Sequence, residues 1–101
     1  MSLTDTQQQL IQSTARIQYH ELQRFYAQGK LLWVDSNLDL VEVAEQIVTD
    51  QLVEIKALQQ QQKIQWPSDD DARRWFAHNQ WFWSVVVAPY VLVQESDDDR
   101  A

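Results

Sequence analysis

The sequence of 101 residues has no cysteine, 1 glycine and 2 prolines. The absence of cysteine excludes disulfides, thiolate zinc sites, iron–sulfur clusters and cysteine nucleophiles. A phosphate-binding loop needs several glycines, because its backbone amides must approach the anion closely. We therefore predict that the protein uses neither thiol chemistry nor a nucleotide cofactor.

Positive charge is also scarce, with 8 Lys and Arg against 15 Asp and Glu and a net charge of −7. This balance repels phosphate backbones and anionic membranes, so we expect neutral or basic protein partners and no membrane association. The solubility that surface charge confers on a small protein is an alternative explanation of the same acidity. The charge thus excludes partners more sharply than it identifies them.

Long apolar segments are missing as well. The longest apolar run, residues 85–93, contains Pro89 and has about half the length of a membrane-spanning helix. The opening MSLTDTQQQL has neither the basic start nor the apolar run of a secretory signal. We therefore expect a cytoplasmic protein.

Apolar residues make up 45% of the chain and include 5 Trp, which is enough for the core of one domain. We predict a single domain over residues 1–94. Residues 95–101 contain three consecutive aspartates, and we predict that they form an acidic, disordered tail.

The first part of the chain, residues 4–28, has apolar residues at roughly helical spacing and predicts an amphipathic helical region. The spacing is imperfect around Gln18 and Tyr19, so the region is either one helix or two helices that meet at an angle. Gly29, the one glycine, is well placed to end it.

The next segment predicts a strand, two helices and a second strand. Four apolar residues at 31–34 indicate a buried strand, and Asp39 has the spacing of an N-cap for the first helix. Thr49 is expected to cap the second helix, and Lys63–Trp66 to form an edge strand before Pro67. The second helix is expected to bury an apolar stripe made of Leu52, Ile55 and Leu58.

Ser68 or Asp69 can cap a short helix that extends through Phe76, and residues 81–94 are rich in β-branched and aromatic residues. We expect the latter to form strand structure that is covered on both faces. The whole order predicts an α+β, winged-helix-like fold: an N-terminal helical region, strand, helix-turn-helix, strand, short helix and C-terminal strand or strands in a small antiparallel sheet.

Two segments, LWVDSNLDLVEVA and VVVAPYVLVQ, carry a resemblance to known sequences. Over residues 15–94 the chain resembles a family of short, uncharacterised bacterial proteins that is classed as a domain of unknown function. The resemblance implies a bacterial cytoplasmic origin. It implies no activity, cofactor or site residue.

No catalytic or metal site is predicted. His20 and His78 lie in different helical segments, and the Asp69–Asp71 and Asp97–Asp99 runs lack the glycine and the terminal glutamate of a calcium loop. No serine has a glycine elbow beside it. An enzyme or sensor for a small charged metabolite, with a cleft lined by Arg73, Arg74 and His78, is kept as a second alternative.

The winged-helix pattern would ordinarily indicate a DNA-binding transcriptional regulator. Its recognition helix, residues 50–62, has Lys56 as its only cation, which is too few for phosphate contacts. We therefore expect no nucleic-acid partner and keep DNA binding as the first alternative.

The preferred hypothesis is a non-catalytic protein-interaction module. Val85–Val93 is apolar on both faces, so it either packs across a homodimer interface or is covered by the first helical region of the same chain. Neighbours in a strand face opposite ways, so Trp81–Trp83 cannot all point inward. The candidate interaction residues are Trp66, Trp81 and Trp83.

Overall fold

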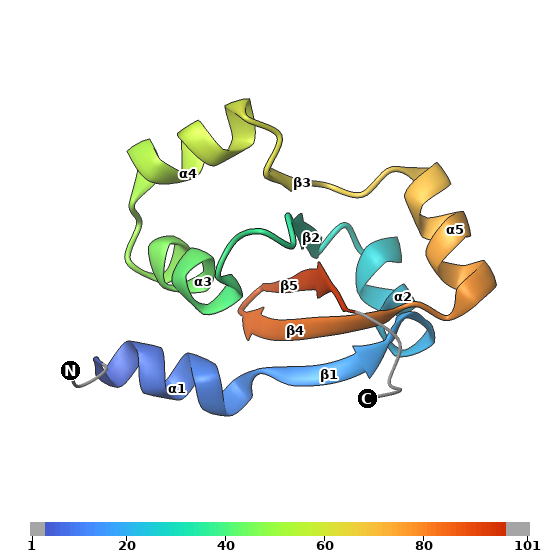
Figure 1. The fold of residues 1–101 in the computed structure, drawn as a ribbon, viewed down its shortest axis with the longest axis horizontal. Coiled ribbons are helices and arrows are strands. Elements are labelled where there is room, and N and C mark those ends of the chain that lie inside the picture. The colour runs from blue at the N-terminus through green and yellow to red at the C-terminus, as the bar shows by residue number, and fades with distance from the viewer. Residues whose placement is uncertain (1–3, 97–101) are drawn as a thin grey trace.

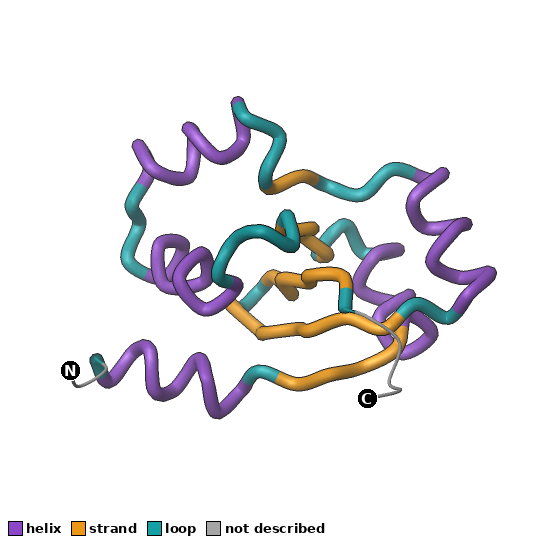
Figure 2. Tube along the Cα trace, viewed as in Figure 1, coloured by secondary structure: helices purple, strands orange, loops and turns teal. Residues whose placement is uncertain are grey.

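The computed structural model describes residues 4–96, which form five helices and one five-stranded sheet (Figures 1 and 2). In chain order the elements are α1 (Asp5–Ser13), β1 (Ala15–Gln18), α2 (Tyr19–Ala27), β2 (Leu31–Val34), α3 (Leu40–Val48), α4 (Leu52–Gln60), β3 (Ile64–Gln65), α5 (Asp69–His78), β4 (Trp81–Val87) and β5 (Tyr90–Glu95). No helix in this part of the chain has the length and apolar character needed to cross a membrane.

The sheet has the strand order β1-β4-β5-β2-β3, and Figure 1 shows it running from β1 at the bottom to β3 at the top. Three pairs are antiparallel, but β2 and β5 are parallel, with Leu32 opposite Leu92. The α+β class is confirmed. The sheet is larger than expected and mixed rather than antiparallel, and a winged-helix likeness is not confirmed.

Helices cover both faces of the sheet. The first face carries Val85 and Leu92, which are buried against α1 and α3, with α4 at the margin. The second face carries Phe82 and Val93, which are buried against α2 and α5. The chain therefore has two hydrophobic cores separated by one sheet, as in other layered architectures.

The expected helical region at residues 4–28 contains two helices. It also contains a strand that the sequence did not predict. β1 lies between α1 and α2, at the position where the helical spacing was imperfect, and pairs Arg16 with Trp83. Gly29 ends the region as expected: its φ is 71°, and its N–H donates to the Tyr26 carbonyl oxygen at 3.0 Å. Glycine suits this left-handed conformation because it has no Cβ.

Two of the expected helix caps are confirmed. The Asp39 carboxylate accepts hydrogen bonds from the backbone N–H groups of Val41 and Glu42, so α3 begins where the sequence predicts. Ser68 and Asp71 form a reciprocal capping box at the start of α5. Both caps accept hydrogen bonds from backbone N–H groups that would otherwise lack a partner at the helix start.

The expected cap of α4 was wrong. Thr49 ends α3 instead, and its hydroxyl donates to the Glu45 carbonyl oxygen at 2.8 Å. Asp50 then adopts a left-handed φ of 55°, and Gln51 precedes α4 without a side-chain cap. Threonine is compatible with both roles, because its hydroxyl can bond backward within a helix or forward at a cap.

The C-terminal apolar segment is a hairpin of β4 and β5 with a turn at Ala88 and Pro89. Most of its apolar residues are buried by helices of the same chain, which is the single-chain alternative; Val86 and Tyr90, at 57% and 37% exposed, are exceptions. Glu95 belongs to β5, and the Ser96 N–H donates to the Trp81 carbonyl oxygen, so these two residues are part of the domain rather than of a tail. Residues 97–101 of the expected tail lie outside the described residues.

Replacing Phe82 by Ala should lower the free energy of unfolding by about 3–5 kcal/mol, because a fully buried ring is lost and a cavity remains. The matched control is Trp83→Ala, one residue along β4. The Trp83 side chain is 43% exposed, so its removal should lower the free energy of unfolding by less than half as much. Urea unfolding followed by circular dichroism measures both. Equal losses for the two variants would contradict the observed alternation of β4.

Candidate interaction surface

Trp66 lies on the surface directly after β3. Its side chain is 53% exposed, and its ring centroid is 5.6 Å from that of Tyr90, which is 37% exposed. The two rings are tilted by 56°, an ordinary geometry for an aromatic pair. Trp66 is thus an exposed aromatic residue in contact with one other aromatic ring.

Trp81 and Trp83 lie on the first face of the sheet, on the opposite side of β4 from buried Phe82. Trp83 is 43% exposed. Trp81 is half-buried, and the Arg16 guanidinium lies 4.5 Å from its ring centroid, where a cation is attracted to the ring. The expectation that consecutive aromatics point to different sides is confirmed.

The structure does not bring the three tryptophans together. Trp66 follows β3 at one edge of the sheet, whereas Trp81 and Trp83 lie on β4, and β2 and β5 separate the two strands. The three residues therefore contribute to two surfaces rather than to one.

A third apolar surface was missed by the sequence prediction. Val48 at the end of α3 and Leu52 and Val53 in the first turn of α4 are 48%, 60% and 78% exposed; we call these three residues the α4 patch. The prediction that Leu52 is buried was therefore wrong. Ile55 and Leu58 do pack partly on the first core.

The position of α4 explains why its first turn is exposed. In Figure 1 the helix lies at the margin of the molecule, and its first turn reaches beyond the ends of the strands. None of its residues is fully buried. A marginal helix buries only the side nearest the sheet, so apolar residues outside that stripe remain in water.

The charged residues around the α4 patch are mainly acidic. Asp50 and Glu54 are exposed beside Leu52 and Val53, and Lys56 is the one cation of α4. Glu45, on α3, is already engaged, because it accepts hydrogen bonds from Thr4 and Gln7 on the α1 side, each at 3.1 Å. The free charges beside the patch therefore favour a basic partner.

Two of the three residues of the alternative metabolite cleft, Arg73 and Arg74, are engaged locally, whereas His78 is exposed. Arg73 pairs with Asp70 and Arg74 with Asp71, each one turn apart on α5. Over residues 4–96 no three His, Asp or Glu side chains are grouped so that they could hold a metal ion. His20 contacts the Phe76 carbonyl oxygen at 3.1 Å through Nε2.

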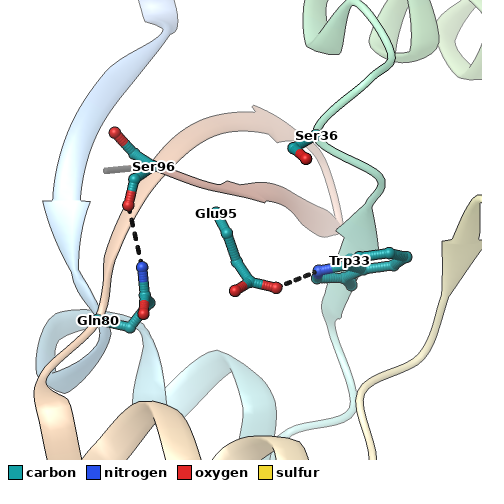
Figure 3. A pocket seen from close by; sticks show the side chains of 5 residues that line it. All are labelled: Trp33, Ser36, Gln80, Glu95 and Ser96. Atoms are coloured by element: carbon teal, nitrogen blue, oxygen red, sulfur yellow. Dashed lines mark hydrogen bonds between the residues drawn. The ribbon is translucent and has the colours of Figure 1, made fainter. Parts of the chain in front are cut away.

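A polar recess is present at one end of the sheet (Figure 3). It has a volume of about 290 Å³ and is lined by Trp33, Ser36, Gln80, Glu95 and Ser96. Glu95 was assigned to a disordered tail from its acidic surroundings, so the sequence prediction did not identify this recess.

These observations define a small α+β protein with a helix layer on each face of a mixed sheet and an uncovered apolar patch on α4. The family model described as "Protein of unknown function (DUF2288)" matches residues 5–95, and the chain belongs to this family. This confirms the resemblance to a domain of unknown function.

A solved structure is similar over the whole chain. It is the NMR solution structure of PA1075 from Pseudomonas aeruginosa, with 36% sequence identity and a TM-score of 0.80, covering 100% of this chain and 94% of that one. Its source is consistent with the expected bacterial origin. No curated protein matches the chain.

The electrostatics of the contact between α2 and α5 can be tested at high pH. The Tyr26 hydroxyl donates to the Asp69 carboxylate, and this hydrogen bond is the main reason that the pKa of Tyr26 is raised to about 12. Because the pKa is raised, the hydrogen bond stabilises the fold below the ordinary tyrosine pKa of about 10, and this stability is lost as the pH rises toward 12.

At pH 11 the Tyr26 phenol should remain mostly protonated, whereas in Asp69→Asn it should be mostly ionised. The Cζ chemical shift of Tyr26 in a ¹³C-labelled protein measures this. Asp70→Asn is the control, because Asp70 pairs with Arg73 and should leave the titration of Tyr26 nearly unchanged. An Asp69→Asn variant that titrates like the wild type would contradict the assigned cause.

Proposed function

We propose that this protein is a non-catalytic interaction module that binds a basic, amphipathic polypeptide segment on the α4 patch. The observation that carries the proposal is the exposure of Leu52 and Val53, 60% and 78%, on a helix that has no buried residue. Exposed apolar residues with a polar margin are typical of protein-binding surfaces.

Burial of these side chains supplies a driving force for association. Covering a Val or Leu side chain contributes roughly 1.5–3 kcal/mol, before the entropic cost of association is subtracted. Three exposed residues that are close in the sequence, Val48, Leu52 and Val53, can therefore anchor a segment with modest affinity. This suits reversible binding of a short helix in the manner of other amphipathic-helix recognition.

The charge of the chain selects the kind of segment. The net charge is −7, and Asp50 and Glu54 flank the patch against the single cation Lys56. A partner with lysines or arginines beside its apolar residues gains attraction, whereas an acidic partner is repelled.

The same charges argue against nucleic acid as the partner. α4 occupies the place of the expected recognition helix, and its exposed first turn presents two apolar side chains, Leu52 and Val53. Binding to a DNA duplex depends on neutralising several phosphates, and one lysine on this helix is too few. The exposed apolar side chains of α4 therefore favour a protein partner.

A synthetic amphipathic helix of leucine and lysine is the probe for this proposal. Fluorescence anisotropy of the labelled peptide should show saturable binding to the full chain, and the double variant Leu52→Ser, Val53→Ser should weaken it by at least about tenfold. The variant should fold normally, since both side chains are largely exposed. Urea unfolding checks this.

Val86→Ser is the matched control, because Val86 is 57% exposed but lies on the second face of the sheet, away from α4. It should bind the peptide as the wild type does. Three outcomes would overturn the proposal: equal affinity of the double variant, equal binding of a leucine–glutamate peptide, or light scattering that shows the α4 patch covered in a homodimer which the double variant dissociates.

A further inference from the structure

The recess in Figure 3 lies where the only parallel pair of the described strands ends. Glu95 is the last residue of β5, and Ser36 follows the end of β2 by two residues. Gln80 directly precedes β4, which begins at the same end of the sheet. Ligands of layered α/β proteins commonly bind outside the carboxyl ends of parallel strands, because loops from several elements meet there.

The Glu95 carboxylate is held in a fixed position in this recess. Its Oε1 accepts a hydrogen bond from Trp33 Nε1 at 3.0 Å, from the neighbouring strand β2. Figure 3 shows the carboxylate between Gln80 and Trp33. This single bond orients the group and leaves Oε2 as an acceptor.

Glu95 is half-buried, yet within residues 4–96 no Lys or Arg forms an ion pair with it. A carboxylate that is partly removed from water loses hydration, and a nearby cation compensates for that loss. Arg16 donates from Nε to Ser96 Oγ at 3.0 Å, on another wall of the recess, so this cation does not pair with Glu95. The recess therefore favours a cation over an anion.

The other walls of the recess also offer acceptors. Gln80 uses Nε2 to donate to the carbonyl oxygens of Trp81 and Ser96, at 3.1 and 3.0 Å, so its Oε1 is the end that can accept. The hydroxyl of Ser36 can also accept a hydrogen bond, whereas Trp33 presents its Nε1 edge to Glu95. An ammonium group, with three donors and a positive charge, matches this set.

We propose that this recess binds a small primary ammonium compound, with the ammonium group against the Glu95 carboxylate. The volume of about 290 Å³ is near the lower end of the pockets that hold small ligands, roughly 300–1,000 Å³. The site shares no residue with the α4 patch, so it is independent of the proposed protein binding.

The test uses the full ¹⁵N-labelled chain titrated with n-butylammonium chloride. The indole N–H signal of Trp33 should shift and saturate, because that group lies at the site, and Glu95→Gln should weaken binding by at least about tenfold. Glu54→Gln is the matched control: it removes the same charge from exposed α4 and should leave the affinity unchanged within about twofold.

Ser36→Leu is the second variant, because it narrows the recess while keeping the bond between Trp33 and Glu95. It should also weaken binding, and it keeps the test decisive if Glu95→Gln disturbs the fold. Three results would overturn the proposal: unchanged affinity in Ser36→Leu and Glu95→Gln, the same saturable shift with potassium chloride, or shifts spread over the acidic surface without a site at Trp33. Failure here leaves peptide binding at α4 untouched, because different residues carry it.

Discussion

The position of β5 in the middle of the sheet is the constraint on which the rest of the structure depends. This last strand lies between β4 and β2, and two consecutive residues of it, Leu92 and Val93, are both 0% exposed. Leu92 belongs to the first core and Val93 to the second, because successive residues of a strand face opposite sides. One strand therefore joins the two cores, and neither core is complete until it is in place.

The parallel pairing of β2 with β5 also positions the polar recess. The two strands end side by side, so Trp33 from one and Glu95 from the other meet in a hydrogen bond. This pairing joins residues that are far apart in the sequence, and such contacts form at a larger cost in loop entropy than local ones. The site is thus a product of the tertiary fold and not of any local motif.

Much of the fold could be predicted because its signals are local. The strand at 31–34, the caps at Asp39 and Ser68, and the boundary at Gly29 each follow from a few neighbouring residues. β1 could not be predicted in this way, because its four residues have little strand character and gain their structure by pairing with β4. The parallel pairing of β2 with β5 was also missed, because no short sequence pattern indicates which distant strands pair or in which direction.

The candidate surfaces were harder to predict, because exposure depends on where helices lie. Alternation along β4 correctly indicated that Phe82 and Trp83 face opposite ways, but not which face is covered. Leu52 fits a helical stripe and was expected in the core, whereas the position of α4 leaves it in water. Glu95 was read as part of an acidic tail, because its partner Trp33 lies far away in the sequence.

The marginal position of α4 has a consequence for how such a protein can change during evolution. A helix that buries no residue fully contributes little to the stability of either core, whereas β5 contributes Leu92 to the first core and Val93 to the second. Substitutions on the outer side of α4 should therefore change the free energy of unfolding very little. Selection can alter what this helix recognises from one lineage to another while the same scaffold persists beneath it.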